Sequence, residues 1–160
     1  MGFVSARPNV RRSTPWRLRP TRELNKQPSL LYDKEKRTPL KIALWQTSPI
    51  HDPHQALAAL DQTARLAKAQ GAELLLTPEM TLGGYNVGPD RCKTLAASED
   101  ALTNALKSIA KKHGIAMVVG LACQGPDRPY NGVVAVDVEG IERHRYYKTH
   151  LFGDVDRCQF

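Results

Sequence analysis

The sequence predicts an α/β layered fold for residues 40–160, and three observations lead to this prediction. Candidate strands and helices follow one another in the order strand, helix, strand, helix, strand, strand, strand. The strand at 115–122, "IAMVVGLA", is apolar throughout, which is typical of a strand covered on both faces. Each candidate helix repeats apolar residues at helical spacing and therefore has one face to bury against a sheet.

The first strand and helix occupy residues 41–71. The stretch "KIALWQT" at 41–47 predicts a strand. Asp52 followed by Pro53 indicates a helix start, with an N-cap and a proline at the first helical position. Gly71 is suited to end this helix. The apolar positions of the helix are Leu57, Leu60, Ala64 and Ala67.

A second strand and helix repeat this pattern. The stretch "AELLLTP" at 72–78 predicts a short buried strand. Ser98 is expected to cap the next helix, with Glu99 and Asp100 near its positive end, and Gly114 ends it. The buried stripe of this helix is Leu102, Leu106, Ile109 and Ala110.

Two further strands follow the apolar strand at 115–122. The segment "CQGPDRPYN" at 123–131 is rich in turn residues. The stretches "GVVAVDV" at 132–138 and "IERHRYYK" at 141–148 then predict a hairpin, with Glu139 and Gly140 as its turn.

The net charge of +7 is concentrated at the start of the chain. Residues 1–41 hold 11 basic and 3 acidic side chains, whereas the remainder holds 12 basic and 13 acidic ones. The predicted domain is therefore balanced, and no nucleic-acid surface is expected on it. The longest apolar run, at 115–123, is about half of the roughly 20 residues that a membrane-spanning helix needs, so no membrane span is expected.

Residues 1–39 are predicted to be a disordered basic extension, because prolines interrupt every local pattern. Three explanations remain open: an organellar transit peptide, a nucleic-acid-binding arm, and an extension without function. An arm of this kind would show steeply salt-dependent binding that is lost when the extension is deleted.

The cysteines and histidines predict neither a disulfide framework nor a metal site. Cys92, Cys123 and Cys158 are odd in number and irregularly spaced, which favours reduced thiols and a cytoplasmic location. The pair His51 and His54 in "HDPH" lacks the further ligands that zinc requires. No metal and no cofactor are therefore expected.

Two opposite charges stand at the ends of predicted strands. Glu79 follows the strand at 72–78, and Lys148 ends the strand at 141–148. In α/β sheets, ligands bind outside the carboxyl ends of strands, so these two residues are candidates for one site. Taken singly, each could equally be a solvated loop charge.

The contexts of these residues resemble the nitrilase superfamily, the carbon–nitrogen hydrolases. "LLLTPEMTLGGY" and "YYKTHLFG" are similar to its glutamate and lysine motifs. "PYNGVVAVDVEGIERHRYYK" resembles its asparagine-containing strand and the hairpin that follows. The opening "KIALWQTSP" and the helix after it also match, so the resemblance covers residues 41–160 in one order.

This resemblance implies an α-β-β-α sandwich that pairs with a second subunit, present here to roughly its first half. It implies hydrolysis of a small amide, carbamoyl or nitrile substrate through a Cys-Glu-Lys triad. Glu79 would be the general base that takes the thiol proton, and Lys148 would stabilise the oxyanion. Asp156 would support the lysine or be a solvated turn residue, and Tyr85 would line the pocket or pack over the turn.

The nucleophile does not match any cysteine of the sequence. The family places it a few tens of residues after the lysine, whereas Cys158 lies ten positions after Lys148. Cys92, in a polar loop, and Cys123, after a strand, are read as ordinary thiols. The alternative is therefore a catalytically inactive fragment or degenerate member that serves at most as an interaction module.

For residues 1–160 expressed alone, we expect no amidase or nitrilase turnover and poor solubility, because apolar sheet surface and unpaired edges would be exposed. Ammonia release and the soluble fraction are the measurements. Hydrolysis that survives Cys158→Ala but is lost in Glu79→Ala would contradict this account of the nucleophile.

Overall fold

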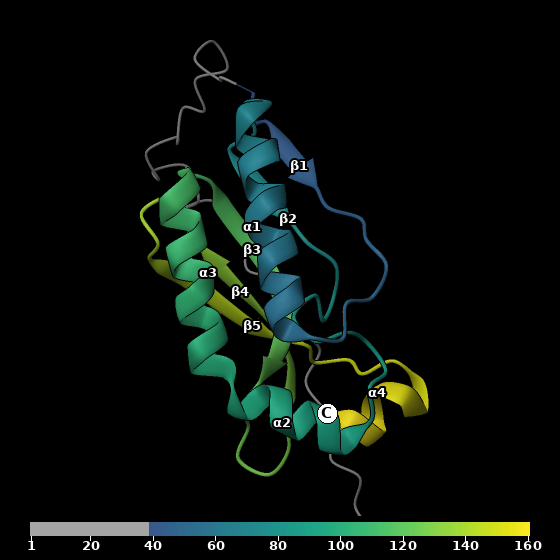
Figure 1. Ribbon diagram of the computed structural model, residues 1–160. Coiled ribbons are helices and arrows are strands. Elements are labelled where there is room, and N and C mark those ends of the chain that lie inside the picture. Colours follow the sequence, from purple (N-terminus) through teal and green to yellow (C-terminus); the bar gives the residue numbers. More distant parts are fainter. Residues whose placement is uncertain (1–38) are drawn as a thin grey trace, which may run out of the picture. The chain divides into compact units, whose positions relative to one another are not determined.

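The computed structural model describes residues 39–160, so the predicted extension at 1–39 lies outside the described residues except for its last position. No helix within this described part is long and apolar enough to cross a membrane. The elements are β1 (Ile42–Leu44), α1 (Pro53–Ala69), β2 (Leu74–Leu76), α2 (Pro89–Ala97), α3 (Glu99–His113), β3 (Ala116–Cys123), β4 (Tyr130–Val136), β5 (Glu142–Tyr147) and α4 (Gly153–Gln159) (Figure 1).

The strands form one mixed sheet in the order β1-β2-β3-β4-β5. Strands β1, β2 and β3 are parallel, and β3, β4 and β5 pair in antiparallel fashion. Figure 1 shows α1 and α3 side by side over the same face of the sheet. The α/β layered fold predicted from the sequence is confirmed.

The main core lies between this sheet face and the two helices. Alternate residues of a strand point to opposite faces, so the central strands contribute every second side chain. Each large apolar side chain that is fully buried contributes roughly 1.5–3 kcal/mol. The core members include Leu75, Met117, Val119, Leu121 and Val134 from the strands and Leu60, Leu106 and Ile109 from the helices.

The opposite face of the sheet is largely uncovered in the part of the chain that the structure describes. Ile42, Leu44 and Tyr146 are 46%, 76% and 50% exposed, and the strand register places them in line with the half-buried Leu74, Leu76 and Val133. The described residues thus form one helix layer and one sheet layer. The expected exposure of apolar sheet surface is confirmed.

Two helices were not predicted, and one residue was misplaced as a result. Cys92, expected in a polar loop, is fully buried on α2. Helix α2 has nine residues and α4 has seven, so neither is long enough to repeat an apolar pattern. They pack through a second small core of Met80, Cys92, Leu95, Ala96, Ala122 and Phe160.

Three local predictions also need correction. The strand expected at 41–47 is shorter, since β1 ends at Leu44. Ser98 makes no side-chain cap for α3, because α2 ends directly before it and its hydroxyl bonds to the Thr94 carbonyl. The hairpin turn is longer than two residues: the Asp137 carboxylate accepts the N–H groups of Glu139 and Ile141.

We expect Gly120→Ala to lower the free energy of unfolding by about 1–3 kcal/mol, because a methyl group at Gly120 would lie 2.7 Å from Met80 N and 2.8 Å from Pro78 O. These atoms belong to the turn that carries Glu79. Urea denaturation measures the loss, and shifted Met80 and Leu82 amide resonances would locate it. Unchanged stability would contradict this close approach of turn and strand.

Candidate active site

Glu79 stands in a tight turn directly after β2. The hydroxyl of Thr81 lies 2.5 Å from the Pro78 carbonyl oxygen and 2.8 Å from the Thr77 hydroxyl, across the base of the turn. Met80, the next residue, is buried and has a φ of 51°, in the left-handed region that costs a non-glycine residue about 1–3 kcal/mol. The surrounding contacts therefore hold the backbone of Glu79 in one conformation.

Lys148 reaches Glu79 through the register of β4 and β5. Its backbone N–H donates to the Asn131 carbonyl at 2.9 Å, which extends the ladder one step beyond β5. Its Nζ donates to Glu79 Oε1 at 2.7 Å and lies 2.7 Å from Asp156 Oδ2. The two residues expected to share a site, 69 positions apart, are thus in direct contact.

Asp156 and Tyr85 extend the contact between Lys148 and Glu79 into a larger network. Asp156 is fully buried, so it is not the solvated turn residue of the alternative interpretation. Its Oδ1 accepts the Tyr85 hydroxyl at 2.8 Å, and its Oδ2 accepts the Phe152 N–H at 2.8 Å. Tyr85 does not simply pack over the turn formed by Gly83 and Gly84, the glycine turn. The structure brings all four candidate side chains together.

The charges of the site stabilise one another. Hydrogen bonds to Asp156 and then to Glu79 raise the pKa of Lys148 above its ordinary range, against the effect of burial. Burial is the largest influence on Asp156 and opposes its ionisation, but the bonds from Lys148, Phe152 and Tyr85 together lower its pKa. The bond to Asp156 also raises the pKa of Tyr85. At neutral pH the lysine is therefore a cation and Asp156 an anion.

Glu79 lies between two hollows. One, of about 270 Å³, lies on the open sheet face and is also lined by Lys148, Asn131 and Tyr146. The other, of about 170 Å³, lies between the segment after β1 and the glycine turn, and Tyr85 lines it. A ligand in either hollow would lie against Glu79.

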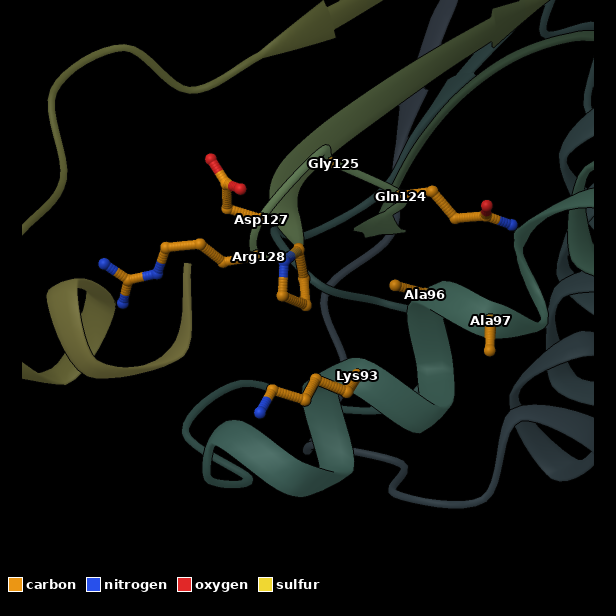
Figure 2. A pocket seen from close by; sticks show the side chains of 8 residues that line it. Lys93, Ala96, Ala97, Gln124, Gly125, Asp127 and Arg128 are labelled. Atoms are coloured by element: carbon orange, nitrogen blue, oxygen red, sulfur yellow. The ribbon is translucent and has the colours of Figure 1, made fainter.

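A third hollow, of about 240 Å³, lies away from these residues, between α2 and the turn from β3 to β4 (Figure 2). The charged ends of Lys93, Asp127 and Arg128 do not converge in it. It contains none of the candidate site residues, and we do not assign it to the site.

The three thiols make no hydrogen bond to Glu79 or Lys148 in the described part of the chain. Burial raises the pKa of Cys92 to about 11 and that of Cys123 to about 12, which disfavours the reactive thiolate. Cys158 is exposed, and its thiol donates to the Val155 carbonyl. Among residues 39–160 no three His, Cys, Asp or Glu side chains gather in a way that would hold a metal ion.

Residues 41–159 match the family described as Carbon-nitrogen hydrolase. The chain belongs to this family. A Pseudomonas protegens protein named "Hydrolase in pqqF 5'region" is 35% identical over 76% of this chain and 43% of its own length. A Pyrococcus abyssi protein named "Nitrilase" is 31% identical over 71% of this chain and 44% of its own length.

The fold is similar to the crystal structure of an amidase from Nesterenkonia sp., with a TM-score of 0.68 and 36% identity. That match covers 74% of this chain and 46% of the amidase. The chain thus spans less than half the length of the relatives it matches. Further structures of this amidase show a complex with butyramide and the addition of acrylamide at the active site cysteine.

One residue of the site received no role from the sequence. Asn131 belongs to the asparagine-containing motif, and its Nδ2 donates to Glu79 Oε1 at 2.5 Å. A buried amide within an otherwise apolar strand was the available signal. Its partner lies 52 positions earlier, so only the folded structure identifies the pair.

We expect Asp156→Asn to lower the free energy of unfolding at neutral pH by about 2–4 kcal/mol, because Lys148 loses a buried anionic partner. The folded pKa of Asp156 lies below its ordinary value of 3.8, so this stabilisation is present above that value and is lost as the pH falls through the lowered one.

The difference between the wild type and Asp156→Asn should therefore shrink as the pH falls below 3.8 and through the lowered pKa, as measured by urea denaturation. Asp154→Asn is the matched control, since Asp154 is on the same helix and exposed. A loss as large in the control, or one independent of pH, would contradict the ion pair.

Proposed function

We propose that this chain supplies the general base and the oxyanion-stabilising group of a hydrolase that cleaves carbon–nitrogen bonds other than peptide bonds. One observation carries the proposal: Lys148 Nζ lies 2.7 Å from Glu79 Oε1 at a hollow of about 270 Å³. Membership of the carbon–nitrogen hydrolase family supports it.

The proposed reaction has two halves. Glu79 takes the proton of a cysteine thiol while the sulfur attacks the carbonyl carbon, and Lys148 stabilises the negative oxygen. The protonated Glu79 returns this proton to the leaving nitrogen, so ammonia departs and a thioester remains. Glu79 then takes a proton from water, whose oxygen attacks the thioester carbon, and returns this proton to the departing sulfur, so the acid and the thiol are released.

Lys148 has one donor available for the oxyanion. An ammonium group carries three N–H donors, of which Glu79 takes one and Asp156 takes another. The two carboxylates hold the ammonium group in place, so the remaining N–H is oriented before substrate binds. Such preorganised donors commonly contribute about 2.7–4 kcal/mol to catalysis.

We propose that the nucleophilic thiol is none of Cys92, Cys123 and Cys158. The first two are fully buried with raised pKa values, and the third bonds to a backbone carbonyl away from Glu79. The thiol would have to reach Glu79 from the side of the open sheet face, where the larger hollow lies.

The proposed substrates are small amides, with carbamoyl compounds and nitriles as alternatives. The butyramide and acrylamide structures of the Nesterenkonia amidase make short aliphatic amides the first to test. We further propose cytoplasmic location, homo-oligomeric assembly, and a mechanism without a cofactor, nucleic acid or membrane partner.

A second candidate function is an interaction module without catalysis. It is favoured by two observations: the described thiols make no hydrogen bond to Glu79, and one sheet face exposes Ile42, Leu44 and Tyr146. The domain would then keep the fold and bind a partner through this face.

The complete reading frame that contains residues 1–160 distinguishes the two candidates. We expect ammonia release from short amides, carbamoyl amines or nitriles, lowered about 10²–10⁴-fold by Glu79→Gln and about 10²–10³-fold by Lys148→Gln. Glu139→Gln, at an exposed hairpin position, is the control and should keep full activity.

Ammonia assays on purified, folded variants are the measurement. Activity that persists in Glu79→Gln would exclude Glu79 as the base, and no turnover on the whole panel would favour the interaction module.

A further inference from the structure

We propose that Asn131 is a positioning residue that holds Glu79 and Lys148 together and leaves Glu79 Oε2 as the oxygen that accepts the proton. This inference rests on the proposed function, since only a general base needs one defined oxygen. It assigns to Asn131 a task that its place in the sheet does not require.

Asn131 contacts both members of the ion pair through different atoms. Its side-chain Nδ2 donates to Glu79 Oε1 at 2.5 Å, and its backbone carbonyl accepts the Lys148 N–H at 2.9 Å. The residue is 4% exposed and pairs with Ala122 of β3 near the start of β4. One buried residue thus fixes the position of the Glu79 carboxylate and of the backbone from which the Lys148 side chain starts.

These bonds make the two oxygens of Glu79 different. Oε1 accepts from Asn131 Nδ2 and from Lys148 Nζ, whereas no residue of the described part donates to Oε2. These two donors occupy both lone-pair directions of Oε1, so Oε1 has no free lone pair to accept a proton from the thiol. Oε2 keeps its lone pairs available and is the oxygen we assign to proton transfer.

Lys148 alone would not determine which of the two Glu79 oxygens stays free to accept the proton. The Glu79 side chain is 45% exposed, so its carboxylate is not held by packing. An ammonium group is a compact charge that binds either oxygen equally well. The planar amide of Asn131 donates in a fixed direction and therefore prevents exchange of the two oxygens.

The sheet itself gives no reason for an asparagine at this position. Asparagine is depleted in strands, and a buried amide is costly unless it is hydrogen-bonded. The side-chain bond that compensates for this cost goes to Glu79, 52 positions earlier, and not to a sheet neighbour. An apolar residue would suit the strand better, so the amide serves the site.

The contact is tested first by NMR on the protein expressed from the complete reading frame. We expect Glu79→Gln to shift the side-chain amide resonances of Asn131, which are assigned by their loss in Asn131→Asp. Thr103→Val is the matched control, because Thr103 is also buried but its hydroxyl has no partner in the described part of the chain. It should leave these resonances in place.

The role is tested next by kinetics on the complete reading frame. Asn131→Ala should lower kcat roughly ten- to hundredfold with KM changed less than about threefold, because the base is misplaced while binding is kept. Asn131→Asp should be slower still, although it is nearly the same size, because a carboxylate cannot donate to Glu79. A residue that only fills space would give the opposite order.

Three outcomes overturn the proposal. The Asn131 resonances could stay unchanged in Glu79→Gln, or the Asn131→Asp enzyme could be as fast as the wild type. The third outcome is a loss of kcat in Thr103→Val as large as the loss in Asn131→Ala. Absence of turnover in the unaltered protein overturns the proposed function and the base-selecting role together. In that case the NMR shift still shows whether Asn131 and Glu79 are bonded, so the two failures are distinguishable.

Discussion

Lys148 lies between two carboxylates that come from distant parts of the described chain. Glu79 belongs to the turn after β2, and Asp156 belongs to α4. A buried anion such as Asp156 is stable only when a cation and hydrogen-bond donors compensate for its lost hydration. The lysine therefore joins the end of β5, the turn that carries Glu79, and α4 into one unit, and each part depends on the other two.

The fold prepares this contact through backbone geometry. Gly120 lets the turn that carries Glu79 lie against β3, and the antiparallel register sets Asn131 opposite Lys148. Because the backbone sets these positions, the site needs few side-chain adjustments before a ligand arrives. The open sheet face beside the larger hollow is where further protein surface could complete the site.

Structural features that depend only on neighbouring residues could be predicted from the sequence. Asp52 caps α1 as expected, with its carboxylate accepting the N–H groups of His54 and Gln55. Gly114 ends α3 in the left-handed conformation. The short helices α2 and α4 were missed because they pack on each other and on distant residues, and no repeated apolar pattern marks them.

The sequence by itself determined the order of the strands and of the two longer helices, the family, and the two charged residues worth testing, since periodicity, caps and motifs are written along the chain. Only the tertiary structure decided that Asp156 is buried beneath Lys148 and that Asn131 holds one oxygen of Glu79. The physical reason is distance along the chain. A hydrogen bond across 52 positions exists only once strand register and turn have brought its atoms within reach, and no local pattern encodes that distance.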